Sequence, residues 1–240
     1  MLTLLSNLLN AFISVCKWPV AVVALVILPF AIIEIDPPYL LATLLGVGQP
    51  FLYGFIAYLL LSLLFPSIFR GKFFSTFEHE LTHAVFGWLC LHRVTRFEAS
   101  DGINRGTDLE EQGYLGVVHL SGSNWLITIA PYFSPTLLLP LYLVALLNPP
   151  AVFLALVGVI CGYHLTSTYS ETGLYQSDIQ KVGYLFTFMF LPAANILVYG
   201  ASLYYFIHGY GVARQYVFNV FIATFEWFMN LIQYTGISFN

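Results

Sequence analysis

Charged residues are scarce in this chain, and their scarcity restricts its class. Only 8% of the 240 residues are Asp, Glu, Lys or Arg, whereas 59% are hydrophobic. A soluble domain carries about 25% charged residues, which cover its apolar core. The composition therefore predicts a multi-pass integral membrane protein whose surface contacts the lipid bilayer. The eight basic residues form no stripe, which excludes a nucleic-acid partner. Orientation and oligomeric state are left open.

Cysteine is almost as scarce, and two further signals are missing. Cys16, Cys90 and Cys161 have no C-x-x-C spacing and lie in or beside apolar runs, so we interpret them as small buried hydrophobes. The N-terminus has neither a basic n-region nor a small-residue cleavage site, so no removable signal peptide is expected.

Long apolar runs predict an all-α polytopic membrane protein with about six transmembrane helices. The runs span residues 17–35, 50–68, 73–91, 125–147, 150–168 and 184–207. Residues 1–16 fit either a helix in the membrane interface or a frayed start to the first span. The segment "DPPYL" after residue 35 should break the first helix, because proline cannot continue it.

Two segments depart from this pattern. Residues 92–124 contain "RVTRFEAS" and "YLGVVHLSGS", which favour strands, joined by the turn-rich "DGINRGTDLEEQG". We expect a small membrane-associated β-hairpin or sheet there. Residues 208–240 have one polar and one apolar helical face, which predicts an amphipathic interfacial helix. The chain thus divides into N-terminal membrane helices (1–72), a core (73–207) and this C-terminal helix.

The most specific motif is "HELTH", within "STFEHELTHAVFGW" at residues 75–88. On a helix, His79 and His83 lie four residues apart on one face and can both bind one Zn²⁺. Glu80 can then take a proton from the water that Zn²⁺ activates. Ionisable groups are costly in a membrane helix, which favours a functional role. The plainer alternative is a polar turn whose acids pair with Arg70 or Lys72.

A zinc site needs a third protein ligand, and several residues distant in sequence qualify. The candidates are Asp178, Glu171, His164, His119 and His208. Asp178 precedes the last span and is either a ligand or a helix cap. His164 is a ligand, a proton donor, an oxyanion stabiliser or a core histidine. Asn195 lies inside the last span, where hydrogen bonding between helices is expected.

With these elements the chain resembles the site-2 protease family of intramembrane zinc metalloproteases, as a divergent member. "HELTHAVFG" is similar to the family's first motif, the strands at 92–124 fall where the family has strands, and "APYFSPTLLLPLYLV" is placed like the start of its next core helix. The resemblance covers about residues 73–207. It implies that Asp178 is the third ligand, although "QSDIQKVG" stands where the family has an L-D-G type motif.

The resemblance implies a zinc-dependent endopeptidase that cleaves membrane-protein or peptide substrates, with Glu80 as general base and acid. A locally extended substrate would add to the edge of the strands near "LSGSNWL". His164, Asn124 and Tyr163 are candidates for stabilising the oxyanion. Two alternatives stay open: a zinc-binding membrane protein without proteolytic activity, acting as a scaffold, and a membrane zinc hydrolase that acts on a lipid.

Overall fold

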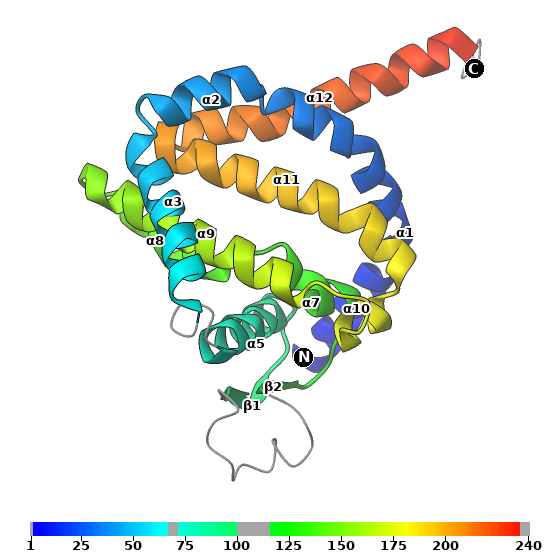
Figure 1. Ribbon diagram of the computed structural model, residues 1–240. Coiled ribbons are helices and arrows are strands. Elements are labelled where there is room, and N and C mark those ends of the chain that lie inside the picture. The colour runs from blue at the N-terminus through cyan, green and yellow to red at the C-terminus, as the bar shows by residue number, and fades with distance from the viewer. Residues whose placement is uncertain (1, 67–71, 100–115, 236–240) are drawn as a thin grey trace.

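The computed structural model describes residues 2–66, 72–99 and 116–235, and these are predominantly helical (Figure 1). The helices are α1 (Leu2–Glu34), α2 (Pro37–Leu45), α3 (Gln49–Leu64), α5 (Lys72–Leu89), α7 (Trp125–Ile129), α8 (Leu139–Ala145), α9 (Ala151–Glu171), α10 (Ser177–Val182), α11 (Tyr184–His208) and α12 (Tyr210–Thr235). The strands are β1 (Val94–Ala99) and β2 (Gly116–Leu120), and the short 3₁₀ helices η1 (Ala130–Tyr132) and η2 (Thr136–Leu138) follow α7.

Helix α1 is one continuous helix of 33 residues, so residues 2–16 continue directly into the predicted first span. Small residues on α1, among them Ala21, Ala24 and Ala31, are buried against α11 and α12. The helix ends before Asp36, whose carboxylate accepts a hydrogen bond from the Tyr39 backbone N–H and begins α2. The break predicted at "DPPYL" is therefore confirmed.

Three helices of the described residues are long and apolar enough to cross a membrane: α1, α9 and α11. Two bent pairs raise the number to five if each pair is one span: α2 with α3 at 89°, and the segments Trp125–Tyr132 and Thr136–Ala145 at 80°. These helices are compatible with a membrane protein, but the described residues do not confirm the predicted number of six spans. The predicted span at 125–147 is broken because Pro131 and Pro135 interrupt the helical hydrogen bonds. Helix α5 is not among these spans.

Helices α3 and α9 touch backbone to backbone. A Cβ atom added to Gly158 would lie 2.1 Å from the Phe51 carbonyl oxygen, and one added to Gly54 would lie 1.9 Å from that of Ala155. Neither position tolerates a side chain unless the helices separate. Small residues at a crossing are typical of helix packing in membranes. This packing fixes α9, whose last residue is Glu171.

The predicted β-hairpin is confirmed as a two-stranded antiparallel sheet, with Phe97 opposite Val118 and Ala99 opposite Gly116. The sheet packs on α5, where the rings of Phe77 and Phe97 lie 5.7 Å apart. Leu120 covers Gly87 of the same helix. The predicted connector "DGINRGTDLEEQG" lies outside the described residues.

At the other end of the chain, α11 and α12 are joined at Gly209, whose φ of 88° suits glycine. As expected, the Asn195 amide links helices: it donates a hydrogen bond to the Tyr132 carbonyl at 3.0 Å. Helix α12 corresponds to the helix predicted at 208–240 and buries Ala213, Tyr216 and Val220. Its C-terminal half extends away from the other helices (Figure 1).

Candidate metal centre

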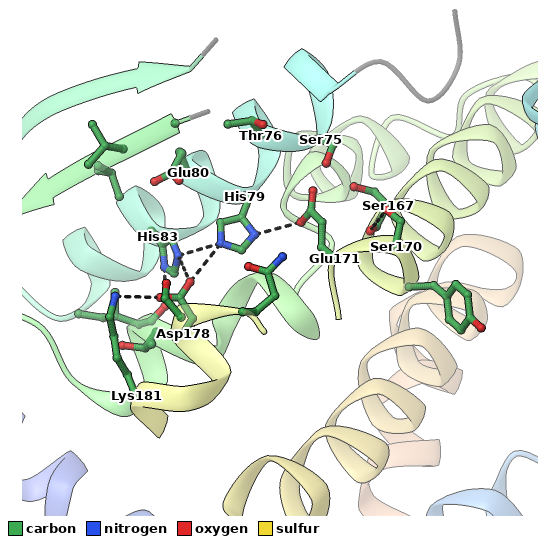
Figure 2. Close-up of a pocket in the computed structure, with 18 of the residues that line it drawn as sticks. Ser75, Thr76, His79, Glu80, His83, Ser167, Ser170, Glu171, Asp178 and Lys181 are labelled. Carbon is green, nitrogen blue, oxygen red and sulfur yellow. Dashed lines mark hydrogen bonds and ion pairs between the residues drawn. The ribbon is translucent and has the colours of Figure 1, made fainter. Parts of the chain in front are cut away.

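Helix α5 presents His79 and His83 on one face, and α10 brings Asp178 to the same point (Figure 2). The two histidine Nε2 atoms lie 3.1 Å apart. Asp178 Oδ2 lies 3.2 Å from His79 Nε2 and 3.1 Å from His83 Nε2. The three ligand atoms therefore form a nearly equilateral triangle, built from helices that are 99 residues apart in the chain at these positions.

The hydrogen-bond partner of Nδ1 fixes the tautomer of each histidine ring. His83 Nδ1 lies 2.9 Å from the backbone carbonyl oxygen of Ile127. His79 Nδ1 lies 3.0 Å from Glu171 Oε2. A carbonyl or an ionised carboxylate can only accept a hydrogen bond, so in both rings Nδ1 carries the proton and donates it. In the neutral rings Nε2 therefore carries a lone pair.

Three lone pairs consequently converge at contact distance, with no hydrogen between them in the neutral state. Such an arrangement is repulsive unless a cation lies among the three atoms or a ring takes up a second proton, which Asp178 and Glu171 favour at His79 by raising its pKa. Ligand atoms of tetrahedral Zn²⁺ are about 3.3 Å apart, given Zn–N distances of about 2.0–2.1 Å, close to the separations of 3.1–3.2 Å found here. His79, His83 and Asp178 could thus hold a metal ion.

The surroundings of Asp178 match this role. Burial alone would raise the pKa of the Asp178 carboxyl. Without a metal ion, hydrogen bonds from the His79 and His83 rings, which form when Nε2 takes up a proton, outweigh burial and hold the pKa below its usual range. The second oxygen, Oδ1, accepts from Lys181 Nζ at 3.3 Å, which leaves Oδ2 for the ligand triangle. The alternative that Asp178 caps a helix is not supported: Gln176 is the N-cap of α10, which has no side-chain cap.

The triangle lies in a cleft of about 1480 Å³ whose walls come from α5, β2, the end of α9, the following loop and α10. Glu80 lines the cleft beside His83, on the side of the strands (Figure 2). The backbone N–H of Val118 in β2 faces its carboxylate. Gly116 also packs closely against Glu80, because a Cβ atom at position 116 would lie 3.0 Å from Glu80 Cγ. Strand β2 thus holds Glu80 close to the triangle.

Two residues expected to contact substrate, His164 and Asn124, are not among the residues that line the cleft. His164 is only 2% exposed, does not line the cleft, and hydrogen-bonds to the Tyr199 hydroxyl through Nδ1. Asn124 caps α7: its Oδ1 accepts from the Ile127 N–H and its Nδ2 donates to Asn10. Both side chains are therefore already used inside the fold.

The remaining candidates for binding metal or substrate lie in different parts of the structure. His208 lies near Thr43, and neither it nor His119 of β2 belongs to the metal-binding group of the described residues. Tyr163 does line the cleft and stays a candidate for contacting substrate. Glu171, a reserve candidate for the third ligand, instead orients His79. Sequence reasoning missed that role, because no local signal pairs an acid at a helix end with a histidine 92 residues away.

Comparison with known protein families, curated proteins and solved structures finds no match to this chain.

Proposed function

We propose that this protein is a membrane-embedded, zinc-dependent endopeptidase. The observation that carries the proposal is the triangle of His79, His83 and Asp178 with Glu80 beside it in an open cleft. Two imidazoles and one carboxylate are a donor set that suits catalytic Zn²⁺, which keeps a further position for water or substrate. A structural zinc site would have a fourth protein ligand, and the group in the described residues has three.

A divalent metal ion held there would supply a Lewis acid that activates water and polarises a carbonyl group. Glu80 would accept the proton of the attacking water as the new carbon–oxygen bond forms, and would deliver it to the amine as the carbon–nitrogen bond breaks. Glu171 and the Ile127 carbonyl would keep both imidazoles in the tautomer that binds metal. Glu80 would transfer the proton, while Glu171 and the Ile127 carbonyl would keep their histidine partners throughout the reaction.

The strand beside the site favours a peptide substrate over a lipid. Gly116, Val117, Val118 and Leu120 of β2 line the cleft, whereas no residue of β1 does. In the part of the chain that the structure describes, β2 pairs only with β1, so no third strand covers its other edge, where the Val118 N–H faces the Glu80 carboxylate. An extended peptide can add to such an edge through main-chain hydrogen bonds, which places its backbone next to Glu80.

The opposite wall suits a polar, locally unwound segment. Helix α9 ends in a run of hydroxyl residues, and Thr166, Ser167 and Ser170 line the cleft there. Thr166 and Ser170 donate their hydroxyl protons to carbonyls of their own helix, which leaves oxygen lone pairs to accept from a ligand. The hydroxyl oxygens on this wall could accept hydrogen bonds from peptide N–H groups. The main chain of β2 would bond the peptide on the other wall.

The test is hydrolysis by the purified protein in detergent micelles. The zinc-loaded wild type should cleave a fluorescently labelled unfolded protein, and Glu80→Gln should bind zinc equally but lose activity by a factor of about 100 or more. Glu80→Gln keeps the size of the side chain and removes only its basicity.

The same preparations separate the alternatives. If the wild type binds zinc but cleaves neither the labelled protein nor membrane-protein peptides, the non-proteolytic scaffold is the better description. If it instead cleaves an ester-linked fluorescent phospholipid, and Glu80→Gln does not, the protein is a lipid hydrolase and the peptidase proposal is wrong.

A further inference from the structure

The N-terminal half of α1 contacts two segments that support the metal centre, although no α1 residue lines the cleft among the described residues. Its contacts come from Asn10, the carbonyl of Ile13, and Lys17. Positions 10, 13 and 17 share one helix face. This face lies outside residues 73–207, where the resemblance to a metalloprotease lies. Figure 1 shows this end of α1 next to α7 and α10.

The first contact holds the helix that carries Asp178. Lys17 Nζ donates a hydrogen bond to the Val182 carbonyl at 2.7 Å. Val182 is the last residue of α10, so its carbonyl has no partner within the helix, and a lysine there also favours the negative end of the helix dipole. The ammonium lies 5.3 Å from the ring centre of Phe186 and 5.7 Å from that of Trp18. Asp178 lies one turn away from this anchor.

The second contact holds α7, whose Ile127 carbonyl orients His83. Asn10 Oδ1 accepts from Asn124 Nδ2 at 2.8 Å and from His92 Nε2 at 3.1 Å. Trp125 Nε1 donates to the Ile13 carbonyl at 2.6 Å. Asn124 and Trp125 form the start of α7, three and two residues before Ile127. The position of the carbonyl is thereby set by α1.

We propose that α1 is a positioning element of the metal centre: Lys17 fixes α10 and Asp178, and Asn10 with Ile13 fixes α7 and the Ile127 carbonyl. The inference rests on the metal site of the proposed function and not on peptide hydrolysis. Helix α1 can carry out this task because its remaining length is packed along α11 and α12. Two of the three ligands, Asp178 and His83, depend in this way on a helix that contributes none of them.

Metal affinity of Lys17→Met tests the proposal, since methionine keeps an unbranched side chain and removes the donor. Loss of a group that positions a metal ligand costs about 10–100-fold in affinity. We expect at least a tenfold weaker affinity for Co²⁺ and Zn²⁺, measured by competition with a chelator. The visible spectrum of the Co²⁺ form should also change, because it reports the ligand geometry. Lys17→Arg retains a donor and should restore both properties.

The matched control is Ser6→Ala on the same helix. Ser6 is buried, but its hydroxyl bonds only the Thr3 carbonyl of α1, so affinity and spectrum should stay as in the wild type. If Lys17→Met does not fold, Trp125→Phe tests the proposal instead, because it removes the donor to Ile13 and keeps an aromatic ring. Unchanged affinity and spectrum in the folded variants would overturn the inference while leaving the metal site intact. A wild type that binds no metal would instead refute the proposed function.

Discussion

Helix α5 has polar residues on two sides, and the two groups differ in a way that composition does not reveal. On the cleft side, His79 and His83 meet Asp178 and Glu171. On the buried side, Glu78 lies 3.9 Å from His164, which in turn bonds the Tyr199 hydroxyl. Each group combines histidine with acidic residues, and each is assembled from distant segments.

The difference lies in where the hydrogens are. Tyr199 can donate a proton to His164, so that contact is a hydrogen bond between neutral groups. The buried group also has one histidine and one carboxylate, with no third metal ligand of the described residues nearby. In the cleft, both Nδ1 protons are committed elsewhere, and three acceptors face one another. Converging acceptor atoms, not the number of histidines, therefore distinguish the group that could hold a metal ion.

The largest expected effect comes from removing one member of each group. Asp178→Ala should reduce bound zinc from about one ion per chain to none, because two histidines alone bind weakly. His164→Ala should keep its zinc and instead lower the thermal stability, since a buried hydrogen bond is lost at a cost of about 1–3 kcal/mol. Elemental analysis and thermal unfolding of the two variants measure this. Zinc loss in both, or in neither, would contradict the distinction drawn between the two groups.

A smaller effect is expected from Glu171, which supports the triangle without belonging to it. Glu171→Ala frees the His79 ring to rotate and to change tautomer, which should weaken zinc affinity about 10–100-fold. The control is Ser170→Ala, which lines the same cleft but bonds only the Ser167 carbonyl of its own helix. Chelator competition distinguishes them. Equal affinities would show that the Glu171 contact does not orient the ligand.

The smallest effect concerns pH and the metal-free protein. Because the pKa of Asp178 is lowered in the folded state, the carboxylate stabilises the fold above its unfolded pKa of about 3.9. That stabilisation is lost as the pH falls through the lower, folded pKa. Between about pH 5 and pH 3, the wild type should lose more stability than Asp178→Asn, which has no such group to titrate. If thermal unfolding shows that both proteins lose the same stability between these pH values, the pKa of Asp178 is not lowered in the folded state.

How much the sequence predicts depends on how far apart the interacting residues lie. His79, Glu80 and His83 are neighbours on one helix, so their spacing suffices to predict a shared face. The hairpin and the break at Asp36 are equally local, being determined by strand residues and by proline. Asp178 was reached through the resemblance, because as a lone acid before a span it fits a helix cap equally well.

The contacts that complete the site could not be predicted this way. The pairing of Lys17 with Val182, or of His79 with Glu171, depends on how α1, α5, α9 and α10 pack, and no pattern along the chain records it. The same is true of His164 and Asn124, whose residue types suit catalysis but whose partners, Tyr199 and Asn10, were unknown. The number of spans stays a prediction, because the prolines at 131 and 135 bend one apolar run that can still count as one span.

The two groups that orient His79 and His83 also differ in their sensitivity to mutation. His79 is oriented by the side chain of Glu171, which a single codon change would remove. His83 is oriented by a main-chain carbonyl of Ile127, which every amino acid at position 127 would supply. One half of the ligand pair is thus protected against substitution of its supporting residue, and the other half is exposed to it. Mutational drift in the supporting residues would accordingly disturb the orientation of His79 before that of His83.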